Sequence, residues 1–266
     1  GGMILLDFGR EIHGSLRILS QWTKPRRVTL TVRLGESVTE ALTPVGERGS
    51  TNDHANRDFS LTLSEYSGTD TNESGFRFAA LELSDGEEIG LKAVEGVLIV
   101  RDVDYIGSFE CPDPVINEIF DTAAYTAHLN MQEYMWDGIK RDRWCWSGDA
   151  YQSYMVNDYL FADRALNRRT ITALYGKPPV LEHVNRINDY SALLLIGTAE
   201  YYFTTGDEEF IRFIYPRAKA LYDFIVSRLD ENGLVVQRPG DWIFIDWSDI
   251  DKNGPLCAEQ ILLWQA

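Results

Sequence analysis

The sequence predicts an antiparallel β-sandwich followed by an all-α region of consecutive helical hairpins, and hence two domains of different fold class. Polar and apolar residues alternate in short segments as far as residue 100, which is the pattern of half-buried strands. From residue 115 onward, apolar residues recur at helical spacing instead. A chain of 266 residues with 44% hydrophobic content is long and apolar enough to form both cores.

The β-sandwich domain is placed at residues 1–108. Turn-rich stretches such as residues 67–70 separate its segments, as expected for antiparallel strands with short connections. The expected strands lie at residues 15–19, 27–34, 59–63, 76–83 and 94–100.

The helical domain is placed at residues 109–266. It begins at Asp113 and Pro114, an N-cap residue followed by proline at the first helical position. Further helices are expected to begin near residues 149 and 163 and to occupy residues 190–204, 210–225 and 257–266. The last run stops without a C-terminal signal, so we expect only the N-terminal portion of a larger helical domain.

The composition excludes several classes of partner. Twenty-five basic and 41 acidic residues give a formal net charge of −16, which would repel nucleic acid and an anionic membrane surface. No segment approaches the roughly 18 apolar residues of a membrane span. Three scattered cysteines and few histidines indicate neither a disulfide framework nor a metal site. If a signal peptide has been removed, a periplasmic or secreted location is favoured over a cytoplasmic one.

The segment 136–149 is the most unusual in the chain. It combines three carboxylates, three basic groups and three tryptophans between two predicted helices. Carboxylates can bind sugar hydroxyls and indole rings can cover the apolar face of a sugar, so the cluster favours a carbohydrate site. Each residue alone is also explained by helix capping, surface ion pairing or loop packing, but binding residues concentrate on loops that join rigid elements.

A second aromatic and acidic cluster lies at residues 240–247 and includes Asp241 and Trp242. In a ring of helical hairpins, successive loops meet at one end and could bring both clusters to one pocket. The alternative is an Asp-Trp helix cap with a buried indole. His183, on another loop, is interpreted as a structural or surface residue.

Glycosidic cleavage normally needs two carboxyl groups that flank the bond, one as proton donor and one as base or nucleophile. The first cluster contains more acids than a structural loop requires. A carboxyl next to Arg141 would have to be shielded from that cation to remain protonated. The pattern by itself therefore leaves the identity of the donor open.

The segment 136–149 resembles the catalytic-loop motif of bacterial α-L-rhamnosidases of glycoside hydrolase family 78. Residues 7–14 are similar to that family's entry into its β-sandwich, and residues 105–114 to the junction into its (α/α)6 barrel. The resemblance covers essentially the whole chain and implies a β-sandwich followed by part of such a six-hairpin barrel.

The resemblance implies inverting hydrolysis of terminal α-L-rhamnosides by general acid/base catalysis, with no metal or organic cofactor. The expected substrate is a rhamnose-containing glycoside, oligosaccharide or polysaccharide. Matched position by position, Asp142 falls nearest the proton donor. Residues that would hold the rhamnosyl ring are Asp137, Arg141, Trp146 and Asp149, with Asp241 and Trp242 as a later sugar-binding pair.

Two departures from the family pattern matter. The usual Arg-Asp-Glu-Arg is replaced by the shorter Arg141-Asp142-Arg143, so Asp149 or Asp137 is kept as an alternative proton donor. The family's general base comes from a later part of the barrel, so residues 1–266 alone are expected to be inactive or nearly so. The oligomeric state is not indicated.

Two other functions remain open at this stage. Another glycosidase or a polysaccharide lyase could use the same helical ring, because a fold does not settle a function. The second is a non-catalytic carbohydrate-binding protein, in which the tryptophans bind sugar and no base is present.

Overall fold

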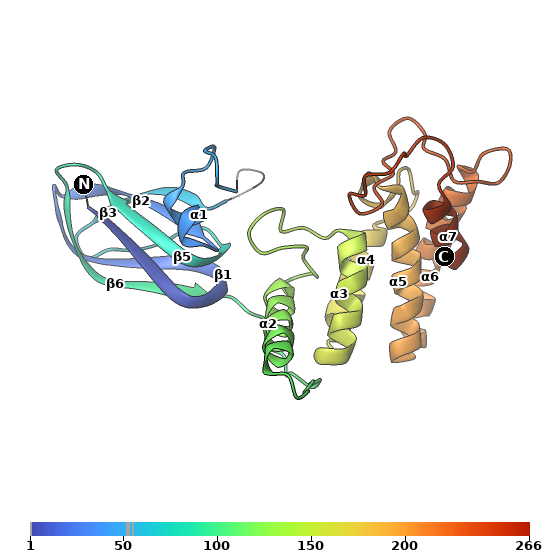
Figure 1. Cartoon of the computed structure of the whole chain (residues 1–266), viewed down its shortest axis with the longest axis horizontal. Coiled ribbons are helices and arrows are strands. Elements are labelled where there is room, and N and C mark those ends of the chain that lie inside the picture. The colour runs from blue at the N-terminus through green and yellow to red at the C-terminus, as the bar shows by residue number, and fades with distance from the viewer. Residues whose placement is uncertain (1, 52–53, 55) are drawn as a thin grey trace. The chain divides into compact units, whose positions relative to one another are not determined.

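The computed structural model of the protein describes residues 2–51, 54 and 56–266, which form two compact units (Figure 1). The first unit comprises Gly1–Arg101 together with Gly138–Arg143. The second comprises Asp102–Asp137 and Trp144–Ala266. The hexapeptide Gly138–Arg143, which lies inside the segment 136–149, therefore belongs to the β unit, although residues of the second unit flank it on both sides.

Every strand that the structure describes in the β unit belongs to one antiparallel sheet. The sheet order is β3-β2-β5-β1-β4, and β6 also pairs with β1. The strands are β1 (Met3–Lys24), β2 (Arg27–Gly35), β3 (Asp58–Ser64), β4 (Gly68–Asp70), β5 (Ser74–Leu83) and β6 (Glu88–Leu98).

The long strand β1 explains how one sheet encloses a core. Its first part pairs with β5 and its second part with β6, and the two registers meet at Gly14. A side chain at Gly14 would place Cβ 1.8 Å from the Val97 carbonyl oxygen, so only glycine fits this crossing. The sheet curls into a half-barrel around buried side chains that include Leu16, Val32 and Phe76.

The predicted class, an antiparallel β domain followed by part of a helical-hairpin barrel, is confirmed. In detail, the strands join in a single curled sheet, where the sequence pattern had indicated a sandwich. The turn expected at residues 67–70 contains the short strand β4. The helix α1 (Val38–Leu42) was not predicted, because five residues are too few to display a helical period.

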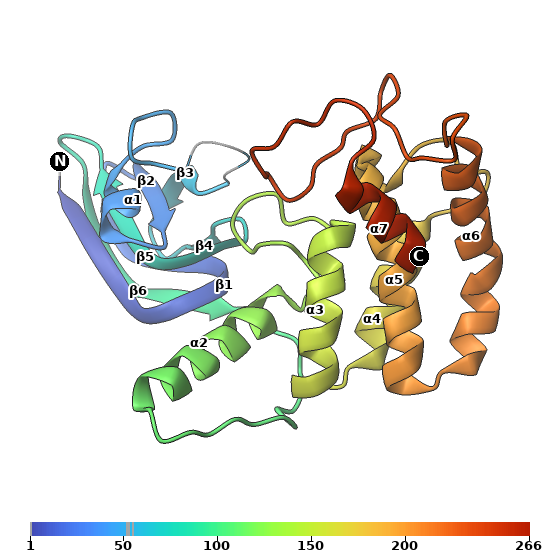
Figure 2. The same cartoon turned by 45° about the vertical axis from the view of Figure 1, so that its right-hand side comes forward.

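The helical unit contains the six helices expected from the sequence. They are α2 (Pro114–Asn130), α3 (Ser147–Leu160), α4 (Arg164–Tyr175), α5 (Asn188–Thr205), α6 (Glu208–Ser227) and α7 (Cys257–Gln265), with a short 3-10 turn at Val184–Arg186. The helix α5 packs against both α3 and α7 (Figure 2). The helices α4 and α6 pack against each other. Buried residues such as Leu166, Ile171 and Tyr201 fill the interior between the helices.

The two sets of helices begin differently. The helices α2, α4 and α6 each start after an aspartate whose carboxylate accepts a backbone N–H of the first turn, namely Asp113, Asp163 and Asp207. The N-cap residues of α3, α5 and α7 make no side-chain capping bond, and each of these helices carries an acid in its first turn: Asp149, Asp189 and Glu259. Carboxylates are favourable at that end of the helix dipole.

Within the described residues, none of the helices combines the length and apolar character that spanning a membrane requires.

Candidate active site

The base of the predicted catalytic loop is closed by hydrogen bonds within the helical unit. The Asp137 backbone N–H donates to the Trp144 carbonyl over 3.1 Å, and the Trp144 N–H donates to Asp137 Oδ1 over 3.0 Å. One carboxylate oxygen of Asp137 thus fixes the loop. A carboxylate that accepts a backbone N–H is stabilised in its ionised form.

The start of α3 is held against α5 through Tyr190. Ser147 Oγ donates to the Tyr190 carbonyl over 2.9 Å, and the Tyr190 hydroxyl donates to Asp149 Oδ2 over 3.1 Å. A side chain at Gly148 would place Cβ 2.4 Å from the Tyr190 ring, so the helix and the ring are in close contact. Burial, followed by the charge of Asp149, raises the pKa of Tyr190, which therefore stays a hydrogen-bond donor.

The aromatic residues of the two predicted clusters meet around Tyr190. The rings of Trp146 and Tyr190 are 6.4 Å apart, and those of Tyr190 and Phe244 are 5.6 Å apart, both edge to face. Trp242 and Trp247 extend this group from Phe244, at 5.1 and 5.0 Å between ring centres. The Asn188 N–H donates to the Trp242 carbonyl, which ties this loop to the start of α5. Trp146, Asp149 and Trp242 are therefore brought to the same end of the helical unit.

Asp241 faces a different set of partners. Arg228 Nη2 donates to its two carboxylate oxygens over 2.7 and 2.6 Å, and the Arg238 N–H donates to it over 3.2 Å. These contacts explain Asp241 as a structural residue of its own loop, and its role in sugar binding stays a prediction. His183 is buried beside it and bonds to Ser191 Oγ, and burial lowers the pKa of His183 to about 4.

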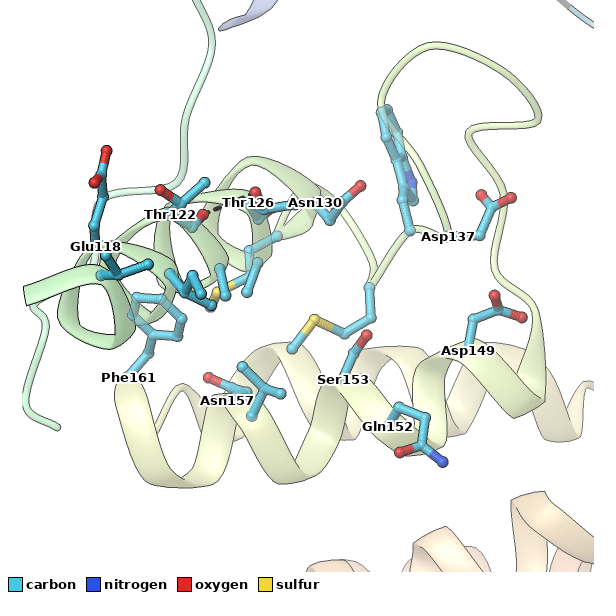
Figure 3. A pocket seen from close by; sticks show the side chains of 18 residues that line it. Glu118, Thr122, Thr126, Asn130, Asp137, Asp149, Gln152, Ser153, Asn157 and Phe161 are labelled. Carbon is cyan, nitrogen blue, oxygen red and sulfur yellow. Dashed lines mark hydrogen bonds between the residues drawn. The ribbon is translucent and has the colours of Figure 1, made fainter. Parts of the chain in front are cut away.

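A groove of about 820 Å³ runs between α2 and α3 (Figure 3). Asp137 and Asp149 lie together at one end of it, while Glu118 and Phe161 lie at the other. Its wall is otherwise largely apolar and includes Met131 and Met135, with polar side chains of α3 such as Gln152. Two carboxylates at the end of a mostly apolar groove suit a ligand that carries hydroxyls on one side and C–H groups on the other.

The tip of the loop, Gly138–Arg143, has its contacts in the β unit. Asp142 is partly buried, with 20% of its side chain exposed, and its Oδ1 contacts His54 Nδ1. Arg141 is exposed. Asp142 and Arg143 have φ angles of 56° and 49°, a left-handed backbone that costs about 1–3 kcal/mol per non-glycine residue unless its surroundings enforce it.

Two residues that shape the site were not singled out in the sequence. Tyr190 joins both clusters, and the Asp189 carboxylate accepts the Phe244 and Ile245 backbone N–H groups over 3.2 and 2.8 Å. The signal that could have identified this region is an acid in the first turn of a helix whose N-cap residue is not a capping residue, as in α3, α5 and α7. Among the described residues, no three or more His, Cys, Asp or Glu side chains form a group that could hold a metal ion.

A curled antiparallel sheet, followed by helical hairpins with carboxylates and aromatic rings gathered where α3 and α5 begin, defines a protein of the six-hairpin glycosidase class. Residues 104–260 match the family model described as the bacterial alpha-L-rhamnosidase 6 hairpin glycosidase domain. The chain therefore belongs to the bacterial α-L-rhamnosidase six-hairpin glycosidase family.

Individual relatives agree with this assignment. An alpha-L-rhamnosidase of Formosa agariphila is 26% identical over an alignment of 195 residues that covers 65% of this chain and 20% of that protein. The structure of a rhamnosidase from Klebsiella oxytoca with rhamnose bound is similar at 25% identity and a TM-score of 0.84, over 99% of this chain and 55% of that one. The GH78 family rhamnosidase of Bacillus sp. GL1 shares the fold, with 21% identity and a TM-score of 0.82 over 98% of this chain and 28% of that one. This chain thus spans between 20% and 55% of the length of these relatives.

Proposed function

We propose that this protein is an inverting α-L-rhamnosidase, which releases terminal L-rhamnose from glycosides, oligosaccharides or polysaccharides by general acid/base catalysis. The observation that carries the proposal is the pair Asp137 and Asp149 at one end of the groove, beside the rings of Trp146 and Tyr190. Asp137, Trp146 and Asp149 belong to the segment 136–149, whose sequence resembles the family's catalytic motif.

In this proposal Asp137 and Asp149 bind hydroxyls of the rhamnosyl ring. Asp137 accepts a hydrogen bond from the Trp144 N–H and Asp149 accepts one from the Tyr190 hydroxyl, so both carboxyl groups are held in place. Ionised carboxylates are strong acceptors for sugar hydroxyls. Trp146 and Trp242 offer ring faces or edges to the C–H side of the sugar, and Arg141 is an exposed donor on the same loop.

Asp142 is the proposed proton donor. Its partner His54 is compatible with that role, because the Nδ1 of a neutral imidazole accepts a hydrogen bond from a protonated carboxyl. Asp137 and Asp149 each already accept a hydrogen bond within the helical unit, which makes those two acids weaker candidates. The general base, which must activate water on the opposite face of the sugar, is proposed to lie outside residues 1–266.

The test is rhamnose release by the full-length protein, from p-nitrophenyl α-L-rhamnoside and from an alkyl α-L-rhamnoside. An alkoxide is a poor leaving group that needs protonation, whereas p-nitrophenolate leaves readily without it. Loss of the general acid in Asp142→Asn should therefore slow the alkyl substrate by about 10²–10⁴-fold and the aryl substrate much less. Asp149→Asn should instead lower kcat/KM on both substrates to a similar extent, mainly because KM rises.

Circular dichroism must show that both variants are folded. Rhamnose binding by a wild-type protein that releases no rhamnose would instead indicate a carbohydrate-binding protein. A product with an unsaturated, ultraviolet-absorbing end would indicate a lyase. Either outcome refutes the proposed hydrolysis.

A further inference from the structure

The tip of the catalytic loop is attached to the β unit by four separate contacts. Lys140 bonds to two glutamates, Ile139 packs against β5, Arg143 bonds to the Glu73 carbonyl, and Asp142 contacts His54. Most residues between Gly138 and Arg143 thus contact the rest of the β unit.

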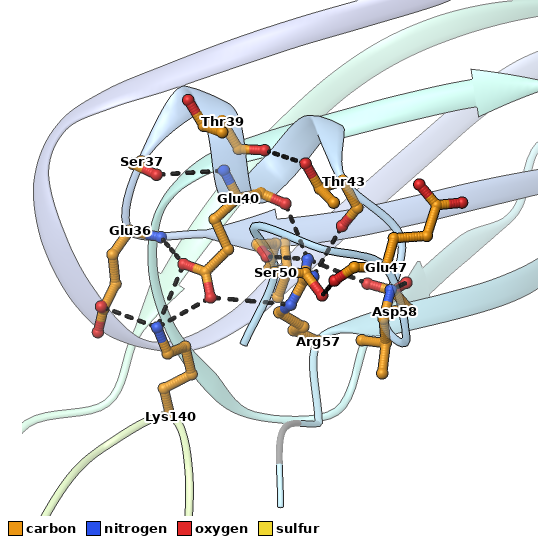
Figure 4. A network of polar contacts seen from close by, with 12 residues as sticks. Glu36, Ser37, Thr39, Glu40, Thr43, Glu47, Ser50, Arg57, Asp58 and Lys140 are labelled. Carbon is orange, nitrogen blue, oxygen red and sulfur yellow. Dashed lines mark hydrogen bonds and ion pairs between the residues drawn. The ribbon is translucent and has the colours of Figure 1, made fainter. Parts of the chain in front are cut away.

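Lys140 is the strongest of these attachments. Only 8% of the residue is exposed, and its Nζ donates to Glu36 Oε2 over 2.8 Å and to Glu40 Oε1 and Oε2 over 3.0 and 3.2 Å (Figure 4). Burial alone would lower the pKa of Lys140, but the hydrogen bonds to the two glutamates raise it, so the ammonium stays charged. A buried ammonium that donates to three oxygen atoms of two carboxylates is held in one place.

The acceptors of Lys140 are themselves fixed. Glu40 is buried in α1, and its Oε2 also accepts the Glu36 backbone N–H over 2.9 Å. The fully buried Arg57 donates to the carbonyls of Glu40 and Thr43 at the end of α1 over 3.0 and 2.7 Å. The loop tip is therefore bound to a rigid part of the β unit (Figure 4).

Ile139 supplies the apolar part of the attachment. It is 7% exposed and lies directly over Gly75 of β5. A Cβ at Gly75 would lie 2.5 Å from Ile139 Cγ1 and 3.2 Å from the Ile139 carbonyl carbon. The sheet thus leaves a space at Gly75 that the loop fills.

Arg143, which directly follows Asp142, makes another hydrogen bond between the loop tip and the rest of the β unit. Its Nη1 donates to the Glu73 carbonyl over 2.6 Å, and its own N–H donates to the Arg141 carbonyl over 2.7 Å. Asp142 and Arg143 both adopt left-handed backbone conformations. Such a conformation persists when the neighbouring contacts enforce it, and these contacts belong to the β unit.

We propose that Lys140, bound to Glu36 and Glu40, is a positioning residue for the carboxyl of Asp142. The inference rests on the proposed function, and it assigns to Lys140 a role in catalysis besides stability. Proton transfer requires the donor within hydrogen-bond reach of the leaving oxygen, so a displaced loop tip slows the step that depends on the acid.

The experiment compares Lys140→Met with wild type in the full-length protein, on the alkyl and the p-nitrophenyl rhamnoside. A displaced acid should lower kcat/KM on the alkyl substrate by at least about tenfold more than on the aryl substrate. A variant that is merely less folded loses the same fraction of activity on both. Lys219→Met, which breaks the exposed ion pair with Asp223, is the matched control and should leave both rates unchanged.

Gly75→Ala is the second variant, because it pushes against Ile139 without removing a charge, and it decides the question if Lys140→Met does not fold. Its control is Gly68→Ala in β4, where the new Cβ would lie 3.0 Å from Leu19 Cδ2. We expect Gly75→Ala to reproduce the selective loss on the alkyl substrate. Equal losses on both substrates, or none, in the folded variants overturn this inference, whereas an inactive wild type overturns the proposed function instead.

Discussion

Glu259 offers a prediction that depends on the helical unit alone. It lies in the first turn of α7, only 3% of it is exposed, and its Oε1 has no hydrogen-bond partner among the described residues. Burial and then the charge of Asp189 raise the pKa of Glu259 from 4.5 to about 8. The native protein therefore keeps this carboxyl protonated at neutral pH, whereas the unfolded chain releases the proton.

The sign of the pH dependence follows from this difference. Because the native state binds the extra proton, the contribution of Glu259 to stability is fully present below pH 4.5 and is lost as the pH rises toward 8. A shift of this size corresponds to about 5 kcal/mol, at about 1.4 kcal/mol per pH unit. Glu259→Gln keeps the shape of the side chain but cannot titrate, so the stability of this variant should not fall between pH 4.5 and pH 8.

Thermal unfolding of wild type and Glu259→Gln between pH 4 and pH 9 tests this reasoning. We expect equal melting temperatures near pH 4 and an advantage of roughly 10 °C for Glu259→Gln at pH 9, at about 2–4 °C per kcal/mol. Glu209→Gln, on the exposed side of α6, corrects for the loss of one negative charge. A difference between wild type and Glu259→Gln that stays constant with pH would refute the assignment of a buried, protonated carboxyl.

Two further outcomes are expected. Arg57→Met should destabilise the β unit by about 3–5 kcal/mol in urea unfolding, because it leaves Glu40 without this cation and removes the hydrogen bonds that Arg57 donates to the Glu40 and Thr43 carbonyls. Arg212→Met, in an exposed ion pair, should change little. Burial, followed by the charges of Asp137 and Asp149, raises the pKa of the Cys145 thiol to about 12, so iodoacetamide at pH 8 should label the exposed Cys257 and leave Cys145 unmodified; rapid labelling of Cys145 in the folded protein would contradict this.

The helices were predictable from the sequence because their signals are local. Asp113 and Pro114 mark the start of α2, and the apolar period continues within the same helix. Gly176 and Gly206 directly follow α4 and α5, as expected for helix ends. Alternation identified the strands in the same way, although it could not show that they join in one curled sheet, because strand pairing is decided by residues far apart in the chain.

The candidate site was predictable only in part. The mixture of acids, cations and tryptophans at residues 136–149 identified the loop, and the structure places Asp137, Trp146 and Asp149 together at one end of the helical unit. The partners of Lys140 lie 104 and 100 residues earlier in the chain, and no local pattern links them. Asp241 was selected for its neighbours in sequence, whereas its carboxylate is bonded to Arg228.

The way the hexapeptide Gly138–Arg143 is shared has a consequence for dissecting this protein. Dividing the chain near residue 101 does not separate the two structural units. The C-terminal piece would still contain the six residues Gly138–Arg143, whose partners lie on the N-terminal piece. The C-terminal piece would expose Ile139 and leave the ammonium of Lys140 without its carboxylates, while the N-terminal piece would keep Glu40 buried with a surplus negative charge. Domain exchange that uses this protein should therefore transplant the hexapeptide together with α1 and the start of β5, as one discontinuous module.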